Sequence, residues 1–282
     1  MQKRIEEFIK YTIENNNYKG AIIGISGGID SAVVAKLCVN ALGRDKVLGI
    51  LLPERDSAKE TLKDSYLVCE SIGINYKMKR ISPIVRALGA YSLKPPAAFI
   101  PRSIKESYVK GKWEELKDRD TYIEDLLNTG NEEFLKGLAF YRAKHRIRMC
   151  KLYLEAEQRG YAVMGTTNKS EMKTGFYVKW GDDSTDIEPI MHLYKTQVIE
   201  LARQLEIPQE IINKSPSPDL IPGITDEFVL KISYYELDKI LMLIETESED
   251  INKEDSQKVN RVKEILKAAE FRNLRNLNLE GI

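Results

Sequence analysis

Residues 21–42 of the chain read AIIGISGGIDSAVVAKLCVNAL. The apolar run 21–25 predicts a buried strand, and the apolar residues of 32–39 recur with the spacing of a helix. The loop between them is named the SGGIDS loop here and consists of Ser26, Gly27, Gly28, Ile29, Asp30 and Ser31. The stretch therefore predicts a strand that ends in a tight turn and leads into a helix N-terminus.

The SGGIDS loop has the chemistry of an anion-binding turn. Glycines let a ligand approach the backbone, N–H groups at a helix N-terminus attract negative charge, and Ser26 and Ser31 add hydroxyl donors. Asp30 would repel a phosphate, so its presence indicates a magnesium ion between the two. The loop has neither the lysine of a P-loop nor the spacing of a dinucleotide-binding glycine motif. A turn that binds nothing is the alternative.

Strand and helix patterns alternate along much of the chain. The further strand candidates are the short apolar runs at 47–52, 74–81, 161–165 and 187–190. This alternation predicts an α/β fold with a doubly wound, mostly parallel sheet of about five strands flanked by helices, in a single domain, 1–282. Ligands of such sheets bind beyond the carboxyl ends of the strands, where the SGGIDS loop is expected to lie.

The composition excludes several classes of function. The chain has 43 basic and 43 acidic side chains, so no net charge draws it to nucleic acid or to an anionic membrane. No apolar run reaches the roughly 18 residues of a membrane span, and no signal peptide is recognisable. Cys38, Cys69 and Cys150 are far apart, which predicts free core thiols in a reducing, cytoplasmic setting. The presence of only two histidines argues against zinc chemistry.

Three segments interrupt the alternating pattern. Residues 90–133 hold a proline-punctuated loop and a charged stretch, 105–125, with interleaved aromatic residues. Because acids cancel the basic residues there, we expect a helical insertion in solvent or an oligomer contact, with nucleic-acid binding as the weaker alternative. Residues 245–256 predict an acidic connection to a C-terminal helix, and the proline-rich segment 213–223 predicts a long loop of the kind that covers active sites.

The SGGIDS loop also matches the Ser-Gly-Gly-x-Asp-Ser loop of the N-type ATP pyrophosphatases, which holds the β,γ-pyrophosphate of ATP. Further motifs follow in order, and with them the chain resembles ammonia-dependent NAD+ synthetase over about 20–82 and 134–240. The resemblance implies the adenine nucleotide α-hydrolase-like fold. The motifs are Gly165–Glu171, Thr174–Asp182, Asp186–Ile190, Leu193–Val198, Ser217–Leu220, Thr225–Glu227 and Ser233–Asp238.

The resemblance implies a ligase. The carboxylate of deamido-NAD would attack the α-phosphorus of ATP, pyrophosphate would leave, and ammonia would displace AMP from the acyl adenylate to form the amide. This reaction spreads negative charge over phosphoryl oxygens, which positioned cations and hydroxyls stabilise. A homodimer with the dinucleotide at its interface is also implied. Because no glutamine-hydrolysing domain is recognisable, we expect free ammonia or a separate glutaminase as the nitrogen source.

The resemblance assigns roles to residues on the ATP side. Asp30, Lys195 and Ser217 would be catalytic, and Lys195 and Ser217 would stabilise the pentacoordinate transition state. Asp30 and Glu171 would bind Mg²⁺, while the SGGIDS loop, Thr166, Lys195 and Ser217 would bind ATP. Each has an ordinary alternative: Lys195 could be a solvated residue of an amphipathic helix, and Glu171 a first-turn residue favoured by the helix dipole.

On the substrate side, the resemblance implies five contacts to the dinucleotide or to ammonia. These residues are Arg146, Phe176, Lys179, Asp182 and Asp186. Arg146 belongs to a motif in which two arginines precede a methionine, as in the family. The two aspartates have an ordinary alternative as turn formers.

The chain departs from the family pattern where the dinucleotide would bind. The family's Gly-Asn pair is replaced by Tyr141-Arg142, and its C-terminal His-Lys-Arg has Phe271-Arg272 as the nearest counterpart. Loss of matched polar groups can change discrimination by several orders of magnitude. Three hypotheses stay open: a divergent NAD+ synthetase, an enzyme that adenylates and amidates another carboxylate, and a non-catalytic ATP-binding protein. The third should have lost its metal-binding and lysine residues, and none is lost.

Overall fold

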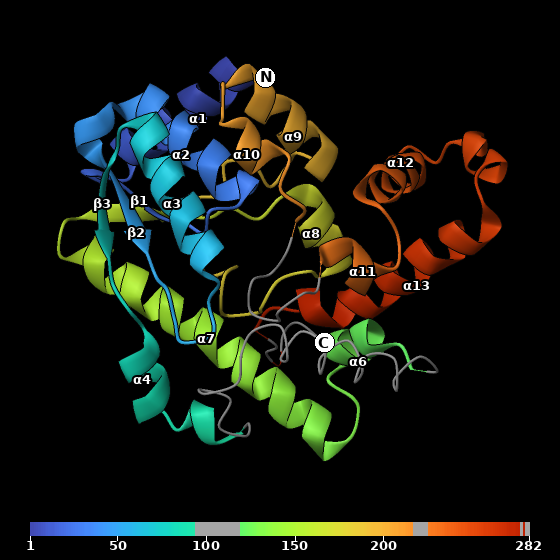
Figure 1. Ribbon diagram of the computed structural model, residues 1–282. Coiled ribbons are helices and arrows are strands. Elements are labelled where there is room, and N and C mark those ends of the chain that lie inside the picture. Colours follow the sequence, from blue (N-terminus) through green and yellow to red (C-terminus); the bar gives the residue numbers. More distant parts are fainter. Residues whose placement is uncertain (94–118, 217–224, 277–278, 280–282) are drawn as a thin grey trace.

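The protein contains a parallel sheet flanked by helices, in a computed structural model that describes residues 1–93, 119–216, 225–276 and 279 (Figure 1). Within these residues the sheet has the order β3-β2-β1-β4. Its strands are β1 (Gly20–Gly24), β2 (Val47–Leu51), β3 (Asn75–Met78) and β4 (Tyr161–Met164). Ile22 of β1 pairs in parallel register with Leu48 and with Val163. The predicted α/β class and parallel sheet are confirmed.

The predicted fifth strand at 187–190 is wrong. Ile187 makes one isolated parallel bridge to Met164, and its carbonyl accepts a hydrogen bond from Gly165 N–H at 2.8 Å. Pro189 follows two residues later and has no N–H with which to continue a ladder, so the chain turns away from the sheet.

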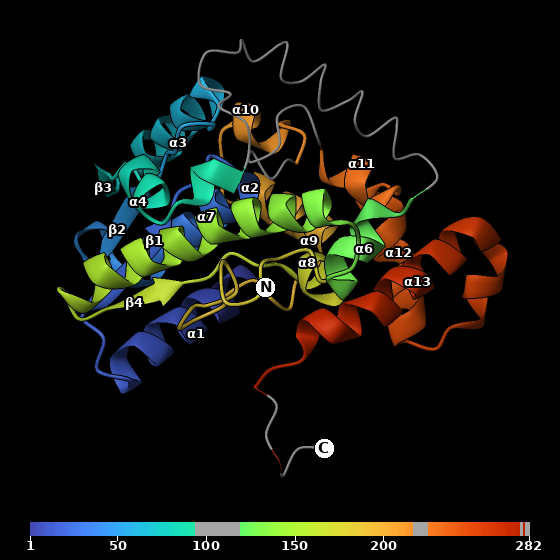
Figure 2. The same cartoon turned by 90° about the horizontal axis from the view of Figure 1, so that it is seen from below.

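Helices cover both faces of the sheet, as a doubly wound fold requires (Figures 1 and 2). Ala21 and Ile23 of β1 pack in one apolar cluster with α1, α2, α3 and α9, whereas Ile22 packs with α4 and α7 on the other face. These elements are α1 (Gln2–Asn15), α2 (Ile29–Leu42), η1 (Arg44–Lys46), α3 (Lys59–Ile72), α4 (Ser82–Ala87), η2 (Ala90–Leu93), α7 (Glu132–Glu157), α8 (Lys169–Thr174), α9 (Lys195–Gln204) and α10 (Gln209–Ile212).

A second apolar cluster holds together a set of helices beside the sheet, named the helical lobe here (Figure 1). Its elements are α6 (Thr121–Leu127), α11 (Asp226–Leu230), α12 (Tyr234–Glu245), η3 (Glu249–Lys253) and α13 (Ser256–Asn273). Tyr122 and Leu126 of α6 are buried in this cluster. The expectation that the whole charged stretch 105–125 lies in solvent is therefore wrong at its C-terminal end, because α6 packs on α13. Residues 94–118 of the predicted insertion lie outside the described residues.

Two expectations from composition can be compared with the fold. Cys38 and Cys69 are buried free thiols as predicted, but Cys150 is exposed on α7, so the prediction of three core thiols is wrong. Among the helices that the structure describes, none has both the length and the apolar character needed to cross a membrane.

Candidate active site

The SGGIDS loop joins the carboxyl end of β1 to α2, as predicted. Gly27 adopts a positive φ of 73°, and a Cβ there would lie 2.7 Å from the carbonyl oxygen of Thr61, so the turn requires glycine. The Oγ of Ser31 accepts a hydrogen bond from Ser26 N–H at 3.3 Å, and Ser26 Oγ accepts one from Gly28 N–H at 3.2 Å. The two serine hydroxyls thus accept hydrogen bonds from backbone N–H groups that could instead donate to a bound anion.

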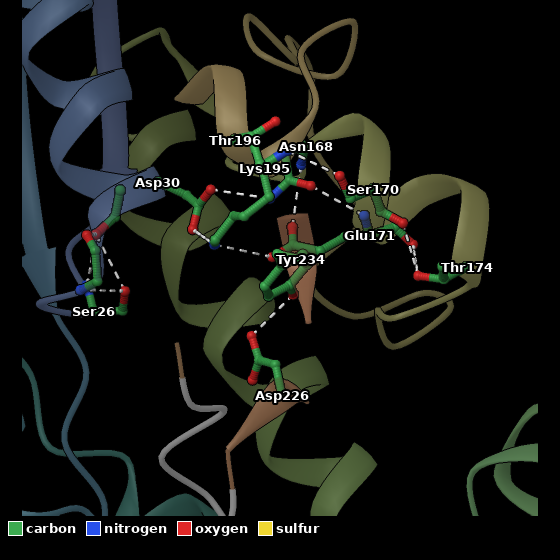
Figure 3. Close-up of polar contacts among 12 residues, drawn as sticks. Ser26, Asp30, Asn168, Ser170, Glu171, Thr174, Lys195, Thr196, Asp226 and Tyr234 are labelled. Atoms are coloured by element: carbon green, nitrogen blue, oxygen red, sulfur yellow. Dashed lines mark hydrogen bonds and ion pairs between the residues drawn. The ribbon is translucent and has the colours of Figure 1, made fainter. Parts of the chain in front are cut away.

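Asp30, in the first turn of α2, faces residues that are far away in the sequence (Figure 3). Its Oδ2 lies 2.5 Å from Lys195 Nζ, and its Oδ1 accepts a hydrogen bond from Asn168 Nδ2 at 3.0 Å. Glu171 Oε1 lies 3.6 Å from the same Lys195 Nζ. Three predicted site residues therefore meet. Together with Asn168, Asp226 and Tyr234, these three residues form a group that is named the strand-end cluster here.

The helix N-termini of α8 and α9 fix the orientation of this cluster. Asn168 and Glu171 form a capping box, in which Asn168 Oδ1 accepts from Glu171 N–H at 3.0 Å and Glu171 Oε2 accepts from Asn168 N–H at 3.1 Å. Asp238 of α12 accepts hydrogen bonds from the Ser170 hydroxyl and, at 2.8 Å, from Thr196 N–H. The helical lobe thus holds the starts of both helices.

Four of the six residues of the strand-end cluster are buried, Asp30 and Glu171 are partly buried, and the cluster carries more acidic than basic groups. The Lys195 side chain is 3% exposed. Burial favours its neutral form, but Asp30, Glu171 and Asp226 outweigh this effect and raise the pKa of Lys195. Burial, followed by the charge of Asp30, raises the pKa of Glu171 well above its usual value. Burial also raises the pKa of Asp226 to about 6. The single positive charge of Lys195 therefore offsets the negative charge of the three carboxyl groups only in part.

This excess of carboxyl groups fits a bound cation. Asp30 and Glu171 supply the hard oxygen ligands that Mg²⁺ prefers, and magnesium commonly takes its other ligands from substrate phosphates and water. No set of three or more potential metal ligands occurs among the residues that the structure describes. The pair therefore fits a cation that arrives with a nucleotide better than a closed protein site.

Two residues of the cluster have roles that the sequence alone did not assign. Asp226 is 5% exposed; its Oδ2 accepts from the Tyr234 hydroxyl at 3.1 Å, and its Oδ1 has no partner among the described residues. The ring centroid of Tyr234 lies 5.4 Å from Lys195 Nζ. Both residues lie in motifs noted above, but only the fold shows that these motifs approach Lys195.

A cavity of about 210 Å³ lies between α7, the loop at 175–190 and the end of α13. We name it the cationic cavity because four of its lining side chains are basic and none is acidic. Its lining residues are Asn128, Arg142, Arg146, Lys179, Trp180, Phe271, Arg272 and Leu274.

A single carboxylate positions two of these arginines. Asp125 Oδ1 accepts from Arg142 Nη2 at 2.6 Å, and Asp125 Oδ2 lies 3.2 Å from Arg272 Nη2. Arg142 Nη1 also donates to Asn128 Oδ1 at 2.5 Å. Arg142, which replaces the family's asparagine, is therefore tied to α6, and Arg272 joins it from the C-terminal helix.

The predicted substrate residues divide into two sets. Arg146 and Lys179 line the cationic cavity, where Arg146 Nη2 donates to the Lys179 carbonyl at 3.1 Å. The other three lie elsewhere. Phe176 packs on Tyr122 with ring centroids 5.7 Å apart, Asp186 accepts from Val163 N–H at 2.8 Å, and Asp182 accepts from Val178 N–H at 2.7 Å. The last two contacts fit the ordinary alternative of structural aspartates.

The remaining predicted ATP residues are placed only in part. Thr166 is half-buried two residues after the end of β4, in the segment that leads to the capping box at the start of α8. Ser217 lies outside the described residues, so its predicted role is not tested.

Comparisons with known proteins agree with this arrangement. The family model for NAD synthase matches residues 1–105 and 104–275. The NH(3)-dependent NAD(+) synthetase of Thermotoga neapolitana is 58% identical over 270 residues, which cover 96% of this chain and 92% of the relative.

Two solved structures resemble the chain over nearly its whole length. The NMN synthetase of Francisella tularensis matches with a TM-score of 0.73 and 25% identity, covering 99% of this chain and 97% of the other. The NH3-dependent NAD synthetase of Campylobacter jejuni matches with a TM-score of 0.71 and 24% identity over the same shares, which shows a common fold. Because the family model matches most of the chain and the Thermotoga neapolitana relative is 58% identical, the chain belongs to the NAD synthase family.

Proposed function

We propose that the protein catalyses the ATP-dependent amidation of deamido-NAD with ammonia, through an acyl adenylate, and releases AMP and pyrophosphate. The observation that carries this proposal is the meeting of Lys195, Asp30 and Glu171 beside the SGGIDS loop. The close relative named NH(3)-dependent NAD(+) synthetase supports the choice of substrate.

The strand-end cluster would act on the phosphates of ATP. The N–H groups and hydroxyls of the SGGIDS loop would hold the leaving pyrophosphate, and Thr166 and Ser217 would add hydroxyl contacts. Lys195 Nζ, fixed by Asp30, would stabilise charge on the α-phosphoryl oxygens as the carboxylate attacks. Asp30 and Glu171 would hold Mg²⁺, which neutralises phosphate charge when bound.

The cationic cavity would bind the phosphate-bearing substrate. Arg146, which also donates to the Lys179 carbonyl, and Lys179 would contact phosphate oxygens, while Arg142 and Arg272 add positive charge. Trp180 is 44% exposed at the same cavity and offers an aromatic face to a heterocyclic ring. The contact that the family's asparagine makes with the dinucleotide would thus be replaced by attraction between the positive charge of Arg142 and the substrate phosphate.

A second candidate substrate is the mononucleotide that also ends in a nicotinate carboxylate. The structure named NMN synthetase shares the fold at 25% identity, and the cationic cavity would attract either phosphate ester. The reaction steps would be the same. The two candidates differ in whether the adenylyl half of the dinucleotide contributes to binding.

The decisive test is AMP release from Mg-ATP and ammonium, with deamido-NAD, with its mononucleotide, and with neither. We expect AMP and NAD+ in equal amounts with the dinucleotide, and far less product with the mononucleotide. Faster turnover of the mononucleotide would favour the second candidate. AMP formation that depends on neither would overturn both.

The proposal also includes a homodimer, as the family resemblance implies, and a cytoplasmic location, as the free cysteines indicate. Ammonia would be supplied free or by a separate glutaminase. Sedimentation of the purified protein with and without deamido-NAD would test the homodimer.

A further inference from the structure

Glu188 lies directly against the loop that follows β4. A Cβ built on Gly165 would collide with the Glu188 carboxylate, so the glycine makes room for it. Thr185 Oγ1 donates to Glu188 Oε1 at 2.7 Å, and the backbone N–H of Thr167 donates to the same carboxylate. The other oxygen, Oε2, is buried and has no hydrogen-bond partner among the described residues.

This position lies between the two parts of the proposed site. On one side, Gly165 and Thr167 flank Thr166 and lead into the strand-end cluster. On the other side, Asp182 acts on Glu188 through its charge and belongs to the loop whose Lys179 lines the cationic cavity. An acyl adenylate must join the phosphorus of ATP to the dinucleotide, so its carbonyl carbon has to lie between these two parts.

The surroundings of Glu188 suit a small cation. Asp182 and Asp183 act on Glu188 through their charge, and Asp183 is already paired with Arg275 at 2.7 Å. From α7, His145 Nδ1 lies 3.5 Å from Asp182 Oδ1, and burial together with neighbouring basic residues lowers the pKa of His145 to about 3. The histidine is therefore neutral, and no described basic side chain pairs with Glu188.

Burial, helped by the two aspartates, raises the pKa of Glu188 to about 7. A carboxylate of this basicity takes a proton from a cationic acid more readily than an exposed one does. A purely structural side chain at this place would need no charge, because an apolar residue could fill the space beside Gly165 without leaving an oxygen unpaired.

We propose that Glu188 accepts the proton that ammonium must lose before its nitrogen can attack the acyl adenylate. The inference rests on the proposed function. Ammonium transfers one proton to Glu188 Oε2, which gives ammonia and a neutral carboxylic acid. The nitrogen lone pair forms the C–N bond to the acyl carbon, and the C–O bond to the adenylate breaks with its electrons on the phosphate of AMP. The nitrogen loses its surplus proton to that phosphate, and Glu188 returns its proton to water.

The test separates the two half-reactions in the Glu188→Gln variant. Exchange of labelled pyrophosphate into ATP, dependent on deamido-NAD, reports adenylation alone. We expect this exchange to be within about twofold of the unmodified protein, while kcat/KM for ammonium falls about 100-fold, the usual range for loss of a general base. Hydroxylamine is largely neutral at neutral pH and needs no base, so its reaction to the hydroxamate should be retained.

Three outcomes would overturn the assignment. Equal losses with ammonium and hydroxylamine would mean that Glu188 only shapes the site. Loss of the exchange reaction would mean that Glu188 acts in adenylation, before ammonia reacts. Full activity with ammonium would exclude any role of Glu188 as a base. If the unmodified protein itself shows no deamido-NAD-dependent exchange, the proposed function fails instead. The Glu200→Gln variant, whose side chain is 59% exposed on α9, is the matched control.

A second variant keeps the carboxylate and changes only its basicity. Thr185→Val removes a hydrogen bond that favours the ionised form, so the pKa of Glu188 should rise further. Because ionised Glu188 is the acceptor, the rise of kcat/KM for ammonium with pH should move to higher pH. The Thr185→Ser variant keeps the hydroxyl and should not shift the profile. An unshifted profile in Thr185→Val would contradict the proposal.

Discussion

The strand-end cluster and the cationic cavity are built in opposite ways. The first is made by loops and helix starts at the carboxyl ends of parallel strands, is mostly buried, and holds more acidic than basic groups. The second is made by the side of α7, the end of α13 and the loop that carries Lys179, and all of its charged lining residues are basic. Chemistry on ATP needs fixed geometry, whereas attraction of a phosphate ester depends mainly on the sum of nearby charge.

This difference explains why one half keeps the family pattern and the other does not. In the strand-end cluster every side-chain oxygen except Asp226 Oδ1 has a partner among the described residues, so a substitution leaves a buried group unpaired. In the cationic cavity Arg142 replaces an asparagine by attaching to Asp125, and the cavity remains positive. Sequence drift is therefore compatible with function in the second region and not in the first.

The largest effect is expected from Asp30→Asn. The variant keeps the size of the side chain and its contact with Asn168, but loses charge next to Lys195 and to the proposed magnesium ion. Loss of several kcal/mol of charge stabilisation corresponds to about a 1,000-fold fall in AMP release at saturating Mg-ATP. The exposed Asp45→Asn variant is the control. Full activity of Asp30→Asn would refute the metal assignment.

A somewhat smaller effect is expected from Lys195→Ala. We expect turnover to fall about 100-fold or more while the Kd for ATP, measured by calorimetry, changes less than tenfold, because the lysine acts mainly on the transition state. Lys173→Ala, at an exposed position on α8, is the control. Equal losses in turnover and affinity would indicate a binding role.

In the cationic cavity a single loss should matter less. Arg146→Ala should raise KM for deamido-NAD about tenfold, the value of one charge-assisted hydrogen bond, and leave the Kd for ATP unchanged. The effect should shrink at high salt, because salt screens the attraction between Arg146 and the substrate phosphate in the unmodified protein. The surface variant Arg203→Ala serves as the reference. A change in turnover as large as that of Lys195→Ala would show that the two regions are not separate.

The smallest effect is a change of stability with pH. The pKa of Glu188 is raised from an ordinary value near 4.5 to about 7 on folding, so the native state holds this proton more tightly than the unfolded chain. That stabilisation is complete below the lower value and is lost as pH rises through the higher one. Relative to Glu188→Gln, the free energy of unfolding should fall by on the order of 2 kcal/mol between about pH 5 and about pH 8. Urea denaturation at several pH values measures this, and parallel curves would mean that the carboxyl is not perturbed.

The sequence predicted the strand-end cluster better than any other part of the molecule. A local pattern, the strand, glycine turn and helix at 21–42, places Asp30, and the topology of parallel sheets brings the end of β4 to the same edge. Asp226 and Tyr234 could not be assigned in this way, because they reach Lys195 through the packing of the helical lobe. The fifth strand was also out of reach, since an apolar run before a turn looks the same as a strand.

The helical lobe is tied to α8 and α9 by Asp238, which accepts hydrogen bonds from the Ser170 hydroxyl and from Thr196 N–H. This has a consequence for protein engineering. A chimera that exchanges α12 between relatives would disturb the start of α8 and α9 unless an acid is kept at position 238. The lobe should therefore be transplanted with positions 170 and 238 taken from the same parent. A recombination boundary between these positions would yield enzymes that fold but whose α8 and α9 start in altered orientations.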